Sequence, residues 1–141
     1  MFRKAPETPS VSYGSGCFVT DSQTGGFNVV RDLAPHIHRQ RLVIEGTPTE
    51  LISAEDITSY LSALSVELDM VEILAPVMHQ SDLYGWAGWI HWETSGAHFY
   101  AWDDPKFFSV DIYTCKAFSA DAAVRFTEKW FAATEIVHKE F

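Results

Sequence analysis

The sequence is poor in cysteine, in basic residues and in long apolar runs, and each shortage excludes a class of protein. Two cysteines in 141 residues are too few for a scaffold held together by disulfides. Ten Lys and Arg residues stand against 19 Asp and Glu residues, so the chain lacks the basic surface that nucleic acid binding requires. No apolar run approaches the length of a membrane span, and we therefore expect neither nucleic acid nor membrane as a partner.

The residues that are abundant indicate one globular domain with aromatic strands. Hydrophobic residues make up 47% of the chain and charged residues 21%, a balance typical of soluble domains. Aromatic residues make up 14%, and many of them fall between Tyr84 and Phe108, where they either pack in a sheet or stack on a flat ligand. Met1–Ser10 lacks the apolar core of a signal peptide, so we expect a cytoplasmic protein with free thiols.

The first part of the chain differs in composition from the rest. Residues 1–38 are rich in Pro, Ser, Thr and Gly, with glycines between short apolar pieces. We predict that they form a partly ordered N-terminal extension, too short for a second domain. Residues 39–141 are predicted to form the folded domain.

Periodicity from residue 39 onward predicts an α+β fold. The period-2 segments predicted as strands are 41–47, 70–75, 85–92, 97–102, 107–115 and 134–138. Ser53 and Ser119 are predicted N-caps of two helices, each followed by acidic residues in the first turn. This order predicts a two-layer α/β sandwich, in which a largely antiparallel sheet carries two helices on one face.

Ser95 follows Thr94 within the most strand-like part of the sequence and has two interpretations. A serine hydroxyl can attack the preceding carbonyl, and elimination then leaves a pyruvoyl group at a new N-terminus. Such a group forms a Schiff base with a substrate amine and accepts electrons during decarboxylation. The alternative is that Thr94, Ser95 and Gly96 form a simple hairpin turn, since Ser and Gly dominate turns.

Cys115 ends the predicted strand 107–115, twenty residues after Ser95. It is either a general acid that returns a proton to the decarboxylated carbon or a small buried hydrophobic residue. His98 and Tyr100 project from one strand face just after Ser95. His98 is therefore either a proton-transfer group or an ordinary sheet histidine.

Acidic residues supply further candidates. Glu45 lies in an otherwise apolar strand, and a carboxylate in that place suggests a binding site. Asp103 and Asp104 form a turn with Pro105, and a carboxylate there is also suited to accept hydrogen bonds from ligand hydroxyls. His36 and His38 have no third ligand at a convincing spacing, and we predict no metal site.

The segment 85–116 resembles the prokaryotic S-adenosylmethionine decarboxylases, small pyruvoyl enzymes of spermidine biosynthesis. The strand Asp111-Ile112-Tyr113-Thr114-Cys115 is similar to the family's strand that ends in the catalytic cysteine. Ser95 stands at the family's distance from that cysteine. Trp102 and Asp104 resemble the family's tryptophan and the acidic residue that holds the ribose hydroxyls, and residues 42–45 resemble its opening strand.

By that resemblance, the protein is a carboxy-lyase that cleaves itself between Thr94 and Ser95, so that Ser95 becomes the pyruvoyl cofactor. Cys115 is then the proton donor, and Glu45, Trp102 and Asp104 bind the substrate. The family fold is a two-layer sandwich that dimerises, so the resemblance implies a homodimer acting on a small molecule of the amino-acid type.

Four positions depart from the family pattern. Tyr100 replaces the family's processing histidine, and Ala87 replaces a serine eight residues before the precursor serine. At the cleavage step, Thr94 replaces the family's glutamate, with Glu93 one place earlier, and Gly96 replaces the histidine that follows the serine. His98, two residues from Tyr100 on the same strand face, is the substitute that the sequence offers. The alternatives are a pyruvoyl decarboxylase of ornithine or arginine, and an unprocessed homologue that binds a ligand or a partner.

Overall fold

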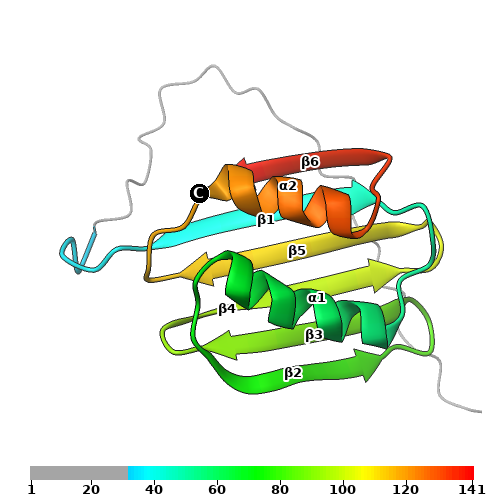
Figure 1. Cartoon of the computed structure of the whole chain (residues 1–141), viewed down its shortest axis with the longest axis horizontal. Helices are drawn as coiled ribbons and strands as arrows, with labels where there is room; N and C mark the ends of the chain where they lie inside the picture. Colours follow the sequence, from blue (N-terminus) through cyan, green and yellow to red (C-terminus); the bar gives the residue numbers. More distant parts are fainter. Residues whose placement is uncertain (1–31) are drawn as a thin grey trace, which may run out of the picture. The chain divides into compact units, whose positions relative to one another are not determined.

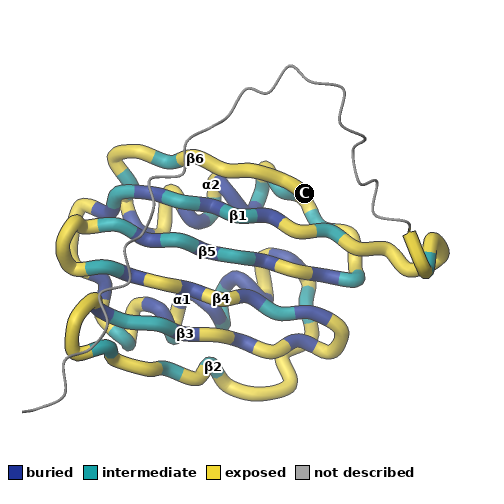
Figure 2. Tube along the Cα trace, turned by 180° about the vertical axis from the view of Figure 1, so that it is seen from behind, coloured by how far each residue is buried: buried dark blue, intermediate teal, exposed yellow. Residues whose placement is uncertain are grey.

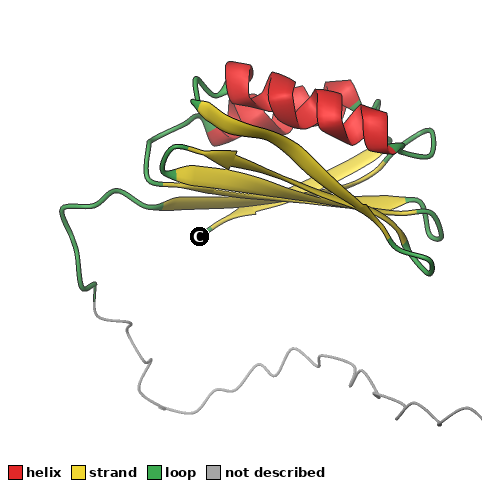
Figure 3. Cartoon of the chain, turned by 90° about the horizontal axis from the view of Figure 1, so that it is seen from below, coloured by secondary structure: helices red, strands yellow, loops and turns green. Residues whose placement is uncertain are grey.

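A computed structural model describes residues 32–141, in which one folded unit comprises residues 33–141. Six antiparallel strands form one sheet in the order β2-β3-β4-β5-β1-β6. Both helices cover the same face of this sheet (Figures 1 and 3). The elements are β1 (Gln40–Thr47), α1 (Ala54–Glu67), β2 (Glu72–Gln80), β3 (Gly85–Trp92), β4 (Ser95–Trp102), β5 (Phe107–Thr114), α2 (Ala120–Trp130) and β6 (Glu135–Glu140). The predicted two-layer α+β sandwich is thus confirmed.

The two helices begin where their capping residues predicted. Ser53 accepts a hydrogen bond from the Asp56 amide, and the Asp56 carboxylate accepts one from the Ser53 amide, which completes a capping box. Ser119 caps α2 through the Ala122 amide. Between the layers lies one apolar core made by alternate strand residues and the inner helix faces. Its largest fully buried side chains are Trp92, Tyr60, Phe99, Phe108, Leu42, Ile44, Ile57, Leu61, Leu64, Ile112 and Val110.

Two predicted element boundaries were wrong. The strand predicted to end before Pro76 continues to Gln80, because β2 is an edge strand and proline is tolerated where no partner needs its N–H. The register of β2 on β3 shifts between Leu74 and Val77, around that proline. Strand β4 begins at Ser95 instead of Ala97, because the hairpin turn needs only Glu93 and Thr94. The simple-turn interpretation of Ser95 is therefore wrong.

Within the described part of the chain, residues 32–141, no helix covers the other face of the sheet, and along the central strands buried residues alternate with intermediate or exposed ones (Figure 2). Trp89, Tyr100 and Tyr113 project from this open face, and each is more than two-fifths exposed. The predicted extension at residues 1–38 falls almost wholly outside the described residues. Among residues 32–141, neither helix is long and apolar enough to cross a bilayer.

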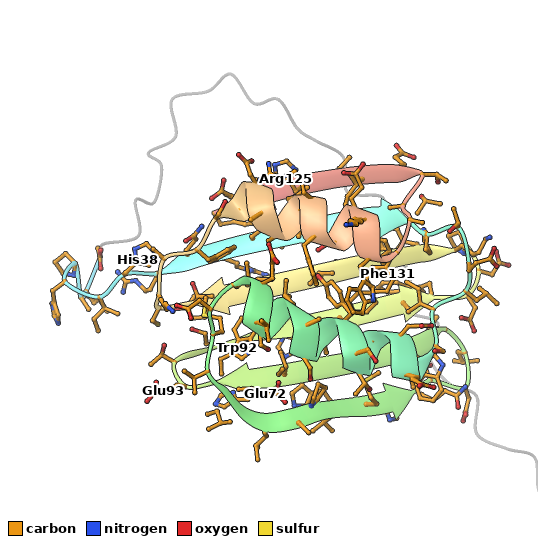
Figure 4. All side chains as sticks on the ribbon, viewed as in Figure 1. His38, Glu72, Trp92, Glu93, Arg125 and Phe131 are labelled. Atoms are coloured by element: carbon orange, nitrogen blue, oxygen red, sulfur yellow. The ribbon has the colours of Figure 1, made fainter. Side chains whose placement is uncertain are left out.

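Trp92 anchors the β3–β4 hairpin to α1 and provides a test of the fold. Its side chain is 1% exposed, and its Nε1 donates to Ser65 Oγ at 2.7 Å (Figure 4). A Trp92→Phe variant is expected to lose about 2 kcal/mol of unfolding free energy, from the void and the lost hydrogen bond. Urea denaturation followed by circular dichroism measures this loss. The control Trp89→Phe, on the open face, should change stability by less than about 0.5 kcal/mol, and equal losses would contradict the assigned roles.

Candidate active site

Ser95 is the first residue of β4, directly after the two-residue turn Glu93-Thr94, and it pairs with Trp92 across the hairpin. Its side chain points toward the helix layer, as do those of Ala97 and Phe99, and it is 8% exposed. Its Oγ accepts a hydrogen bond from the Cys115 amide at 3.2 Å and lies 3.3 Å from Thr94 Oγ1. The hydroxyl is therefore held next to the peptide bond that it would attack.

Cys115 lies one residue beyond β5, in a turn that three hydrogen bonds hold. Thr114 Oγ1 donates to the Lys116 carbonyl at 2.6 Å. Lys116 Nζ donates to the Asp69 carbonyl and, at 2.6 Å, to Asp69 Oδ2. The pairing of Gly96 with Tyr113 brings the start of β4 to the end of β5. Two residues twenty positions apart, Ser95 and Cys115, thus meet in space.

A groove reaches Ser95 from the open face of the sheet. It has a volume of about 630 Å³ and is lined by the hairpin turn, by β3 and β4, and by residues of β1 and β5. His98 and Ser95 both line it, although His98 projects from the open face and Ser95 toward the helices. The residues at its wall include both apolar and titratable side chains, among them Trp89, His91, Glu93 and Tyr113. Its volume falls in the usual range of small-molecule sites.

Arg41 and Asp111 contribute a charged pair to this groove that sequence reasoning missed. Arg41 Nε lies 2.9 Å from Asp111 Oδ1, and Nη2 lies 2.7 Å from Oδ2, a bidentate geometry. Hydrogen bonding to Asp111 raises the pKa of Arg41 further above its usual value. Arg41 on β1 and Asp111 on β5 both project from the open face. They meet because Asp111 pairs with Val43, which lies two residues from Arg41 on the same face of β1.

Aromatic rings form a row along the open face from His98 to β5. The ring centroids are 6.3 Å apart for His98 and Tyr100, 6.2 Å for Tyr100 and Trp102, and 5.3 Å for Trp102 and Phe107. The ring planes are tilted by 37–48° to one another, and the centroid spacings lie in the usual range of packed aromatic pairs. The row starts at His98, which lines the groove, and runs along β4 away from Ser95.

Two of the positions that depart from the family pattern, Tyr100 and Ala87, are direct cross-strand neighbours. They line a hollow of about 560 Å³, which His79 and His98 also line. His79 pairs with Ala87 on the far side from Tyr100, so sequence spacing gave no signal for it. These two departures are therefore one local change on the open face, whereas Thr94 and Gly96 flank Ser95 at the hairpin.

The predicted substrate-binding residues do not all lie near Ser95 within one chain. Trp102 ends β4 and Asp104 follows it, whereas Ser95 begins β4, a separation of about 23 Å at the usual rise of a strand. Glu45 lies on β1, opposite Ser109, and lines a separate hollow with Val137 and Lys139. The structure brings Ser95, Thr94 and Cys115 together at one end of the sheet, places His98 three residues along β4 on the open face, and leaves Glu45, Trp102 and Asp104 apart.

Both a solved structure and a protein-family model show which family shares this fold. An adenosylmethionine decarboxylase from Aquifex aeolicus VF5 is similar in structure, with a TM-score of 0.64 and 16% identity. The likeness covers 74% of this chain and 89% of that one, and at this identity it shows a shared fold. The family model of S-adenosylmethionine decarboxylase matches residues 43–141. The chain belongs to this family of decarboxylases. No curated protein matches it.

Proposed function

We propose that this protein is a self-cleaving, pyruvoyl-dependent decarboxylase that acts on S-adenosylmethionine for spermidine biosynthesis in the cytoplasm. The observation that carries the proposal is the contact between Ser95 Oγ and the backbone of Cys115 at 3.2 Å. Membership of a family that is generally pyruvoyl-dependent supports it. Two observations support Ser95 as the precursor serine: its hydroxyl lies 3.3 Å from the Thr94 side-chain hydroxyl, and the residue is 8% exposed, which shields it from bulk water.

A pyruvoyl group formed from Ser95 would supply a carbonyl that accepts the electrons released when a carboxylate departs. The chain's own residues would do the rest. Cys115 would donate the proton to the carbon that loses CO₂, as a general acid placed next to Ser95. Glu93, His91 and His98 line the groove and would orient the polar parts of the substrate, while Trp89 supplies an apolar wall.

We further propose that the active form is a symmetric homodimer built through the open faces. The support is geometric: within one chain, Asp104 and Trp102 lie at the opposite end of β4 from Ser95. A two-fold axis that lies between the two stacked sheets and runs perpendicular to the strands would place Asp104 of the partner subunit at the Ser95 end of this chain. The exposed rings of Trp89, Tyr100 and Tyr113 would then be buried between the two sheets.

The experiment that tests the proposed function is intact mass spectrometry of the purified chain, followed by a CO₂-release assay. Cleavage yields fragments 1–94 and 95–141, the second beginning with a pyruvoyl group. The cleaved protein is then assayed with S-adenosylmethionine, ornithine and arginine as separate substrates. Release from ornithine or arginine alone would assign the same chemistry to another amino acid. A chain that stays whole after long incubation would be the unprocessed homologue instead.

A further inference from the structure

We propose that the peptide N–H of Cys115 takes part in self-cleavage, and that Lys116 and Asp69 are positioning residues that hold this N–H against Ser95. The inference rests on the proposed function and assigns a role to residues that the proposed chemistry does not use. It concerns the backbone of Cys115, whereas the proton donor proposed above is its thiol.

The N–H of Cys115 is available to Ser95 because β5 ends one residue earlier, at Thr114. It donates to Ser95 Oγ at 3.2 Å. A neutral N–H bound to an oxygen gains strength when that oxygen becomes negatively charged. The donor therefore matters most in a step that leaves charge on the Ser95 oxygen.

Helix α1 and the turn after it contact two segments that neighbour Ser95, one at Lys116 and one at Trp92. Asp69 follows the C-cap Leu68 with a positive φ of 52°, and its amide donates to the Val66 carbonyl at 3.1 Å. Lys116 is bound to this rigid turn through two oxygens of Asp69, which fixes the Cys115 amide. On the other side, Ser65 of α1 accepts from Trp92, the cross-strand partner of Ser95.

Self-cleavage contains one step that leaves negative charge on the Ser95 oxygen, the elimination. Ser95 Oγ first bonds to the Thr94 carbonyl carbon, the peptide C–N bond breaks, and the hydroxyl proton passes to the Ser95 nitrogen. A base then removes the Ser95 Cα proton, the Cβ–Oγ bond breaks, and Oγ leaves as part of the Thr94 carboxylate. Water finally replaces the nitrogen, which departs as ammonia. The Cys115 N–H would stabilise the oxygen that becomes a carboxylate, more strongly in the transition state than in the ester.

The test compares Lys116→Met with the matched control Lys106→Met. Lys106 also donates from an exposed Nζ to a backbone carbonyl, that of Thr49 at 2.7 Å, but in a different part of the fold. We expect Lys116→Met to slow cleavage about tenfold, because the N–H is displaced but not removed. We expect Lys106→Met to cleave at the wild-type rate and Lys116→Arg to restore most of the loss. Cleavage is followed by intact mass over time, at equal thermal stability by circular dichroism.

A second readout separates this role from simple loosening of the turn. Hydroxylamine attacks the ester and releases fragment 95–141 with an N-terminal serine in place of the pyruvoyl group. If elimination is the step that slows, the share of serine-ended fragment rises in Lys116→Met. An unchanged share, or cleavage of Lys116→Met at the wild-type rate, would overturn the inference while leaving the proposed function in place. A wild-type chain that never cleaves would overturn both.

The ion pair itself has a measurable pH signature. Hydrogen bonding and charge from Lys116 lower the pKa of Asp69, so the contribution of the pair is present above the ordinary carboxyl pKa and is lost as pH falls through the depressed value. Carboxyl-carbon NMR of the chain should show the Asp69 pKa rising toward its usual range in Lys116→Met. No rise would mean that the ion pair does not form, which would also overturn the inference.

Discussion

A Ser95→Ala variant is expected to remain a single chain of 15.9 kDa and to release no CO₂ from any substrate. The reason is chemical: alanine has no oxygen to attack the Thr94 carbonyl, so neither the ester nor the pyruvoyl group can form. The fold should survive, because the Ser95 hydroxyl makes two hydrogen bonds, with the Cys115 amide and with Thr94 Oγ1, at the edge of the core. Intact mass after long incubation, together with the CO₂ assay, measures both effects.

The matched control for this variant is Ser81→Ala. Ser81 Oγ also accepts a backbone N–H, that of Leu83 at 3.2 Å, and it lies in the turn between β2 and β3. We expect Ser81→Ala to cleave and turn over as the wild type does. Appearance of the 1–94 and 95–141 fragments in the Ser95→Ala variant would show that the pyruvoyl assignment is mistaken.

A Cys115→Ala variant is expected to cleave itself and yet to lose turnover by about 10²- to 10⁴-fold, the usual cost of removing a general acid. Alanine keeps the peptide N–H that bonds to Ser95 Oγ but lacks the thiol that would donate the proton. The measurement is CO₂ release per mole of cleaved protein, so that slower cleavage is not counted as slower turnover.

Cys17→Ala is the control for the thiol. Cys17 is the other cysteine of the chain and stands in the predicted N-terminal extension, so its loss should leave turnover unchanged. Full activity in Cys115→Ala would remove the proton-donor assignment. It would leave the backbone role of Cys115 intact, since that role is measured by cleavage.

Much of the fold could be predicted because its signals are local. Ser53 and Ser119 were identified as N-caps from their own sequence neighbourhoods, and the structure confirms both. The strand predicted at 107–115 from its period-2 pattern is β5, and its alternate apolar residues Val110 and Ile112 are fully covered. Such signals depend on residues within one turn or one strand, so they survive without knowledge of the partners.

The wrong predictions concern strand ends and residue pairs that depend on a neighbouring strand. Pro76 looked like a strand end, yet it is accommodated because β2 has a neighbour on one side only. Ser95 looked like a turn residue, yet the pairing of Trp92 with Ser95 extends β4 to that position. Arg41 with Asp111, and Asp69 with Lys116, are pairs 70 and 47 residues apart, for which no local pattern gives a signal.

By itself, the sequence determined the class of fold, because period and caps are properties of short segments, and it nominated Ser95 and Cys115 as candidate site residues from their spacing. Only the tertiary structure decided that the Ser95 hydroxyl meets the Cys115 backbone, and that Arg41 meets Asp111. The physical reason is that strand register depends on hydrogen bonds between distant segments, and a change of one residue would move every side chain to the other face.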